Sequence, residues 1–248
     1  CSFAAHTGLS RNAFYAVNKW VGHMRGGLAM ATIGACTGFA AVCGDSIATA
    51  ATMCRVALLE MRRYKYADQL SLSTIACGGM LGFMIPPSIA FIIYSSLTEV
   101  SIGSLFIAGI FPGVLIAFLF TAALYITCRH NPGLGPAGPR ASWKERVVAL
   151  RNVWGMVLLF ALVMGGLYGG IFTPTEAGAA GAFGTLVLGL SQRQLTWKGF
   201  TTSLSDAARL TGMIFILIIG AQMFSYFITL TEIPFLLARF VAGLTIPL

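Results

Sequence analysis

Three long apolar runs, over residues 101–128, 152–172 and 211–230, constrain the fold of this chain more than any other feature. Each is near or above the ~20 residues that an α-helix needs to cross the hydrocarbon core of a bilayer. Strands of membrane barrels are about ten residues long and alternate strictly between apolar and polar side chains, which these runs do not. The sequence therefore predicts an all-α, polytopic membrane protein. The low share of charged residues, 10%, agrees.

The basic residues lie in short stretches between the apolar runs, so the net charge of +8 indicates membrane orientation rather than nucleic-acid binding. The turns that carry Glu99 and Glu176 have no Lys or Arg nearby, as expected for the opposite side of the membrane. Two basic stretches are predicted to face the cytoplasm: they contain Arg62, Arg63 and Lys65, and then Arg129, Arg140, Lys144, Arg146 and Arg151.

Cysteine and histidine patterns point to no catalytic or metal centre. The six cysteines form no CxxC pair and no Cys/His cluster at metal-ligand spacing, so we predict no disulfide framework, metal site or cofactor built on them. His6, His23 and His130 lie near predicted membrane boundaries without a carboxylate or second histidine at fixed spacing. We expect the protein not to be an enzyme.

The apolar segment 26–58 is interrupted by the polar cluster Gly44-Asp45-Ser46. The cluster leaves halves of about 18 and 12 residues, which are short for full crossings. Basic residues stand at both ends, so both ends are expected on the same side of the membrane. A re-entrant helical hairpin satisfies both observations. Its tip is a candidate site, because non-helical backbone at membrane depth is tolerated only where it is buried in protein or lines a watery cavity.

The next apolar segment, 70–97, is interrupted by three glycines and two consecutive prolines: Gly78, Gly79, Gly82, Pro86 and Pro87. Pro87 has no amide hydrogen and forces Pro86 away from helical geometry. A broken helix and an ordinary proline kink both fit this pattern, since membrane helices tolerate proline.

The remaining segments complete a predicted order along the chain. Residues 10–25 have an amphipathic pattern typical of a helix at the membrane interface. A weak internal likeness between residues 6–28 and 228–248 indicates an inverted repeat, a feature of alternating-access transporters. The predicted parts are the end of a preceding helix (1–9), an interfacial arm (10–25), a transport-domain part (26–97), a crossing (98–128), a cytoplasmic linker (129–151), three crossings with an amphipathic connector at 191–209 (152–230) and a second arm (231–248).

Asp45 at the predicted hairpin tip requires a partner, because an unpaired charge at membrane depth is costly. Arg55 or Arg25 would supply one, as would a proton, because burial disfavours the charged carboxylate. A bound cation is the third solution. Unwound carbonyls and half-helix ends are the parts from which transporters build such sites.

Five stretches, quoted in order, resemble one family: "VGHMRGGLAMATI", "AVCGDSIATAAT", "GGMLGFMIPPS", "SIGSLFIAGIFPG" and "GIFTPTEAGAAGAF". Together they look like the large membrane subunit of tripartite ATP-independent periplasmic (TRAP) transporters, over nearly the whole chain. The resemblance implies a sodium-coupled, elevator-type importer of organic acids in the bacterial inner membrane, working with a small membrane subunit and a periplasmic substrate-binding protein. The family's second hairpin and second broken helix have no counterpart before Leu248, so we expect a fragment.

The resemblance also implies a site. Cys43 and Asp45 stand where the family usually has serines, so sodium coordination is expected to be tighter, altered or replaced by proton coupling. Carried over by position, the cation-binding residues are Cys43, Gly44, Asp45 and Ser46 at the tip and Gly82, Ile85 and Pro87 at the break, with Thr49 and Ser88 beside the substrate.

Parts of the sequence also fit two rival functions. An intramembrane aspartyl protease needs two carboxylates that share one site, and the second candidate, Asp68, lies in a basic loop. A non-transporting scaffold subunit would show no cation-dependent change in stability or accessibility.

Glu176 follows a Thr-Pro-Thr turn, which favours a plain helix-start carboxylate over a functional one.

Overall fold

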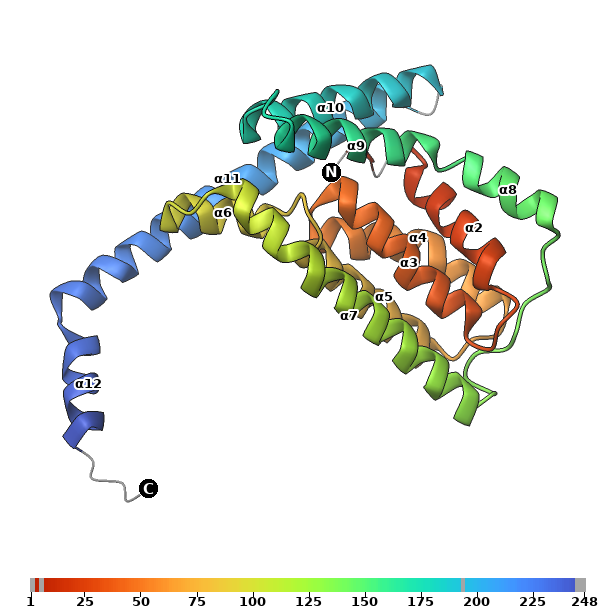
Figure 1. The fold of residues 1–248 in the computed structure, drawn as a ribbon, viewed down its shortest axis with the longest axis horizontal. Helices are drawn as coiled ribbons and strands as arrows, with labels where there is room; N and C mark the ends of the chain where they lie inside the picture. Colours follow the sequence, from red (N-terminus) through yellow and green to blue (C-terminus); the bar gives the residue numbers. More distant parts are fainter. Residues whose placement is uncertain (1–2, 5–6, 193–194, 244–248) are drawn as a thin grey trace. The chain divides into compact units, whose positions relative to one another are not determined.

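The computed structural model describes residues 3–4, 7–192 and 195–243. Over these residues it is almost entirely α-helical and contains no strand, which confirms the all-α prediction. The chain divides into two compact units, Cys1–Phe200 and Thr201–Leu248. The helices α11 (Trp197–Leu230) and α12 (Ile233–Gly243) account for the second unit, α11 beginning just ahead of it (Figure 1).

The helix α3 (Gly27–Cys43) is the centre of the first unit. Twelve of its 17 residues are buried, as expected for a helix that is apolar on all sides. Its glycines admit close neighbours, since a β-carbon at Gly34 would lie 2.9 Å from Val17 and one at Gly38 would lie 2.8 Å from Met156. The helices that contact α3 are α2 (Leu9–Val21), α4 (Ser46–Arg63), α5 (Asp68–Met84), α7 (Ile102–His130) and α9 (Trp154–Tyr168) (Figure 1).

The two interrupted segments of the sequence are both interrupted in the structure. α3 and α4 form a helical hairpin around Gly44 and Asp45, and α4 continues to Arg63, beyond the predicted end at 58. α5 ends at Met84 and α6 (Ile89–Thr98) begins after a gap. Of the two interpretations of the prolines, the broken helix is therefore the one observed.

Three segments of the described chain are long and apolar enough to cross a membrane: Asp68–Thr98, Ile102–His130 and Trp197–Leu230. They coincide with three of the predicted crossings. A fourth candidate consists of α8 (Trp143–Arg151) and α9 taken together, which are bent by 44° to each other. α9 alone has only 15 residues, so the predicted crossing at 152–172 is shorter than expected.

Two predicted boundaries differ from the structure. α10 (Pro174–Ser191) covers the second of the three crossings predicted within 152–230 but is not among the membrane candidates of the described chain. Its many glycines and alanines are only weakly apolar. The predicted connector at 191–209 is not a separate helix, because α11 runs from Trp197 without interruption. Residues 1–2 and 5–6 of the predicted segment 1–9, with His6 among them, and residues 244–248 of the second arm lie outside the described residues.

The predicted linker is held against the start of α3. The Gly26 amide donates to the Gly135 carbonyl at 2.9 Å, and the Gly138 amide donates to the Gly22 carbonyl at 2.9 Å. The buried Tyr66 hydroxyl donates to the Pro136 carbonyl at 2.9 Å. These contacts fix the loop between α7 and α8 across the ends of α2 and α4.

α8 is fastened to α2 by side chains. Lys19 Nζ lies 3.2 Å from Glu145 Oε2, and this hydrogen bond raises the pKa of the lysine above its ordinary value. The Arg146 guanidinium lies 5.8 Å from the ring of Trp20 and 5.3 Å from that of Trp143. Cation–π contacts of this kind contribute about 0.5–1 kcal/mol each at exposed positions.

Candidate functional site

The hairpin tip is formed by two residues with complementary backbone preferences. Gly44 ends α3 in the left-handed region, with φ of 64°, which a glycine adopts without steric cost. Asp45 is extended and caps α4, its carboxylate accepting a hydrogen bond from the Ile47 amide at 2.9 Å. Thr49 is buried, and its hydroxyl donates to the Asp45 carbonyl at 2.6 Å. Thr49 therefore supports the turn.

The break between α5 and α6 exposes backbone that a continuous helix would satisfy. Ile85 is extended because it precedes Pro86. The buried Ser88 hydroxyl donates to the Phe83 carbonyl at 2.8 Å and so replaces the amide that Pro87 lacks.

The tip and the break touch each other through their backbones. The Ile89 amide donates to the Gly44 carbonyl at 3.0 Å. A β-carbon added to Gly82 would lie 2.8 Å from the Asp45 carbonyl oxygen, and one added to Gly44 would overlap the Pro87 carbonyl oxygen. Only glycine allows this approach at either position.

The oxygen atoms gathered here are hard ligands. Asp45 as a whole residue is half-buried, and the neighbouring Ser46 hydroxyl belongs to the same turn. Within the described residues, no hydrogen bond outside the helices is accepted by the carbonyls of Ile85 or Pro87. Carboxylate, hydroxyl and free carbonyl oxygens suit a small hard cation. In the described part of the chain, no three His, Cys, Asp or Glu residues are grouped so that they could hold a metal ion.

The chain matches one family model along almost its full length. Residues 1–247 match the DctM component of the tripartite ATP-independent periplasmic transporters. The chain belongs to this family. Its members are integral membrane proteins, which places this DctM-type chain in the bacterial inner membrane.

Curated relatives agree with this assignment. A C4-dicarboxylate TRAP transporter large permease protein from Pseudomonas aeruginosa is 36% identical over 98% of this chain and 57% of its own length. An ectoine/5-hydroxyectoine large permease protein from Ruegeria pomeroyi is 39% identical over 88% and 51%. An isethionate TRAP permease protein from Oleidesulfovibrio alaskensis is 34% identical over 98% and 38%. The chain spans about half the length of the relatives it matches.

The structure brings most of the predicted site residues of this DctM-type chain together. Gly82 and Pro87 lie directly against Gly44 and Asp45. The side chain of Ile85 points elsewhere, since its Cγ1 would lie 3.1 Å from a β-carbon at Gly113 in α7. Only its carbonyl is left for the site. The assignment of these residues to sodium stays a prediction.

A cavity of about 220 Å³ adjoins the tip and the break. Cys43, Pro87 and Ser88 line it, and Thr49 does not. The location of Ser88 and Thr49 beside the substrate stays a prediction. The opposite wall was not foreseen from the sequence and comes from α6, α7, α9 and α10: it includes Ile92, Phe106, Val163, Leu167, Ala177 and Thr185. The signal for it was the run of small residues in α10, which indicates close helix packing.

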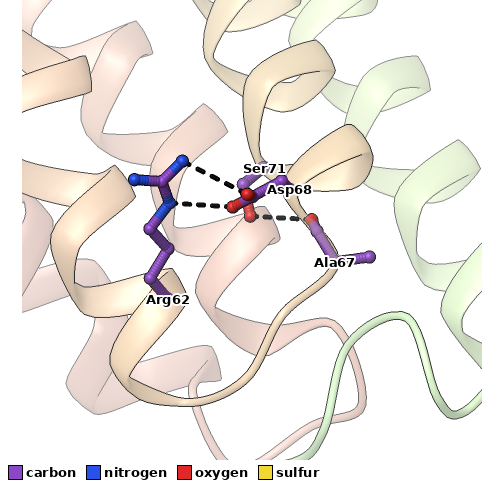
Figure 2. Close-up of polar contacts among 4 residues, drawn as sticks. All are labelled: Arg62, Ala67, Asp68 and Ser71. Carbon is purple, nitrogen blue, oxygen red and sulfur yellow. Dashed lines mark hydrogen bonds and ion pairs between the residues drawn. The ribbon is translucent and has the colours of Figure 1, made fainter.

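The competing partners of Asp45 are not beside it. No ion pair within the described residues joins Asp45 to Arg55 or Arg25. Asp68 lies at the opposite end of α5 from Gly82, about 21 Å along the helix axis. There Arg62 donates two hydrogen bonds of 2.8 and 3.2 Å to its carboxylate, and the Ser71 hydroxyl donates to the Ala67 carbonyl at 3.0 Å (Figure 2). Asp45 and Asp68 cannot share a proton as a protease dyad would require.

Glu176 has the structural role that its sequence context favours. Its carboxylate accepts hydrogen bonds from the Thr173 amide and hydroxyl, each 2.8 Å, and its amide donates to the Thr173 hydroxyl at 3.4 Å. Pro174 occupies the first turn. This is a complete capping box, and it confirms the interpretation of Glu176 as a helix-start carboxylate.

Proposed function

We propose that this chain is part of the large permease subunit of a cation-coupled importer, and that sodium is held between the hairpin tip and the break. The observation that carries the proposal is the backbone contact of Gly44 and Asp45 with Gly82 and Pro87. Two non-helical stretches meet where no side chain separates them. Such stretches are the usual origin of coupling-ion sites in transporters with broken helices.

The donor set supports sodium in particular. Sodium requires several oxygens and no proton chemistry, and the tip offers the Asp45 carboxylate, the Ser46 hydroxyl and backbone carbonyls. Gly82 and Pro87 contribute carbonyl oxygens from the facing segment. Cys43 contributes its carbonyl, since the thiol is a soft ligand. The whole proposed set is Cys43, Gly44, Asp45, Ser46, Gly82, Ile85 and Pro87.

The substrate is proposed to be an organic acid that enters the cavity beside Ser88. The relatives named above are assigned to C4-dicarboxylates, ectoines and isethionate, so the permease fold itself does not fix one substrate. The family is tripartite by name. We therefore propose a small membrane subunit and a periplasmic substrate-binding protein as partners, and movement of α3–α6 as one elevator body.

The test is uptake of a carboxylate by the full-length permease with both partners in liposomes, as a function of sodium and pH. Replacing Asp45→Asn removes a charge from the donor set. We expect the sodium concentration for half-maximal uptake to rise about tenfold, equivalent to loss of one charge-assisted contact. Asp68→Asn, about 21 Å from Gly82 along α5, is the matched control and should leave the sodium curve unchanged.

A proton-coupled mechanism is the second candidate, and the carboxylate at position 45 favours it. It predicts that uptake responds to pH rather than sodium and that Asp45→Asn abolishes this pH response. Uptake that is indifferent to both ions would contradict any ion coupling at the tip.

A further inference from the structure

A larger cavity, of about 710 Å³, lies between α2 and α4 beneath the linker loop. The sequence indicated no function for it, and it does not include the hairpin tip. Its walls are one face of α4, one face of α2 and the loop around Gly138 and Pro139. The loop is held in place by the hydrogen bond from the Gly138 amide to the Gly22 carbonyl.

The cavity is strongly basic. Four basic residues line it, Arg11, Lys19, Arg55 and Arg63, against one acidic residue, Glu60. Lys19 is paired with Glu145 of α8. The guanidinium groups of the three arginines form no ion pair or hydrogen bond with any residue that the structure describes. Their charges are therefore available to a ligand.

The arginines are presented together because of helical spacing. Arg55, Leu59 and Arg63 follow one another at intervals of four and share one stripe of α4. Arg55 and Arg63 are about 12 Å apart along the helix. α2 supplies the opposite wall, where Arg11 and Tyr15 are also four residues apart. Positive charge thus extends along the cavity rather than at one point.

The lining is amphipathic. Leu59 is 68% exposed, Tyr15 48% and Tyr64 36%, so apolar and aromatic surface stands beside the guanidinium groups. The hairpin base also adjoins the basic stretch that the charge distribution assigns to the cytoplasmic face. A free phosphate would use the charges but not the apolar surface. An anionic phospholipid would use both.

We propose that this cavity binds the phosphate headgroup of an anionic phospholipid of the cytoplasmic leaflet, with its acyl chains along Leu59 and the tyrosines. The arginines would contact the phosphate oxygens, for which the guanidinium fork is well suited. The inference is independent of the proposed function, because lipid binding at the hairpin base requires neither sodium nor substrate.

The experiment uses the full-length permease in neutral detergent and measures lipid binding by native mass spectrometry, with the thermal midpoint as a second readout. The probes are phosphatidylglycerol, phosphatidylcholine and inorganic phosphate. The test variant is Arg11→Gln/Arg55→Gln/Arg63→Gln, and the matched control, Arg129→Gln/Lys144→Gln/Arg151→Gln, removes the same charge outside the cavity. A lysine variant at the three test positions keeps the charge in case the glutamine variant folds poorly.

We expect phosphatidylglycerol to bind and raise the midpoint of the wild type and of the control, with little effect of phosphatidylcholine. Binding by the test variant should be about a hundredfold weaker, because it removes three basic contacts to an anionic lipid, each equivalent to about a factor of five. The lysine variant should bind at an intermediate level. Three results would overturn the proposal: equal binding of both lipids, equal losses in test and control variants, or full stabilisation by inorganic phosphate alone.

Discussion

The two ends of the hairpin α3–α4 differ in the interactions that define them. At the tip, Gly44 and Asp45 are packed against Gly82 and Pro87 by backbone atoms, without an intervening side chain. Towards the base, Arg55 and Arg63 of α4 and Arg11 of α2 line an open cavity. The structure of the tip depends on close backbone packing, whereas the charged side chains near the base determine what the cavity can bind.

This difference predicts two kinds of sensitivity to substitution. Where backbone packs on backbone, there is no free space for an added carbon atom, so the substitution lowers the stability of the fold through steric clash. Where flexible charged side chains face a cavity, removing one changes the affinity for a ligand but hardly changes the fold. The following substitutions test this contrast.

The largest effect is expected for Gly44→Ala. The added methyl group would overlap the Pro87 carbonyl, and alanine would have to adopt the φ of 64°. We expect the free energy of unfolding of the intact permease to fall by about 3 kcal/mol or more, measured by denaturant titration in detergent.

Gly165→Ala in α9 is the control for this substitution. Nothing lies within 4 Å of a β-carbon at that position, so alanine should be neutral or stabilising by up to about 1 kcal/mol. Equal effects of the two substitutions would show that the tip is not packed as described.

An intermediate effect is expected for Ser88→Ala at the break. The substitution leaves the Phe83 carbonyl without its donor in a buried position, which should cost about 1 kcal/mol. Ser96→Ala is the matched control, because the Ser96 hydroxyl donates to the Ile92 carbonyl on an exposed helix face. A Ser88→Ala variant as stable as this control would argue that water readily replaces the serine at the break.

The sequence predicted the two interruptions because their causes are local. Gly44 before Asp45 ends one helix and caps the next, and Pro86 with Pro87 prevents continuation through the break. These are properties of neighbouring residues, so no knowledge of the fold was needed. The contact of Gly82 with Asp45 was anticipated only through the family resemblance, because it joins residues 37 positions apart.

The features that the sequence did not predict depend on long-range packing. The basic cavity combines Arg11 of α2 with Arg55 and Arg63 of α4, and no spacing rule connects separate helices. The predicted helix lengths were also wrong, because α11 runs from Trp197 through most of the predicted connector. The polar residues that follow Trp197 can continue a helix as well as end one. Amphipathic patterning determines which face is buried but not where a helix stops.

The smallest effect is expected at the contact between α2 and α8, where two partly exposed charges pair with each other. Lys19 and Glu145 form an ion pair whose side chains are 24% and 53% exposed, so Glu145→Gln should cost at most about 1 kcal/mol. Because the pair raises the pKa of Lys19, its contribution is complete below the ordinary lysine pKa. It is lost as the pH rises through the elevated value in the folded protein.

Thermal midpoints of the wild type and of Glu145→Gln should therefore differ slightly at neutral pH and converge at alkaline pH. Lys144→Gln, at the neighbouring exposed position, should show neither the difference nor the convergence. A gap between wild type and Glu145→Gln that persists at high pH would mean that Glu145 stabilises α8 through packing rather than through the charge on Lys19. The contact between α2 and α8 would then depend on packing, as the hairpin tip does.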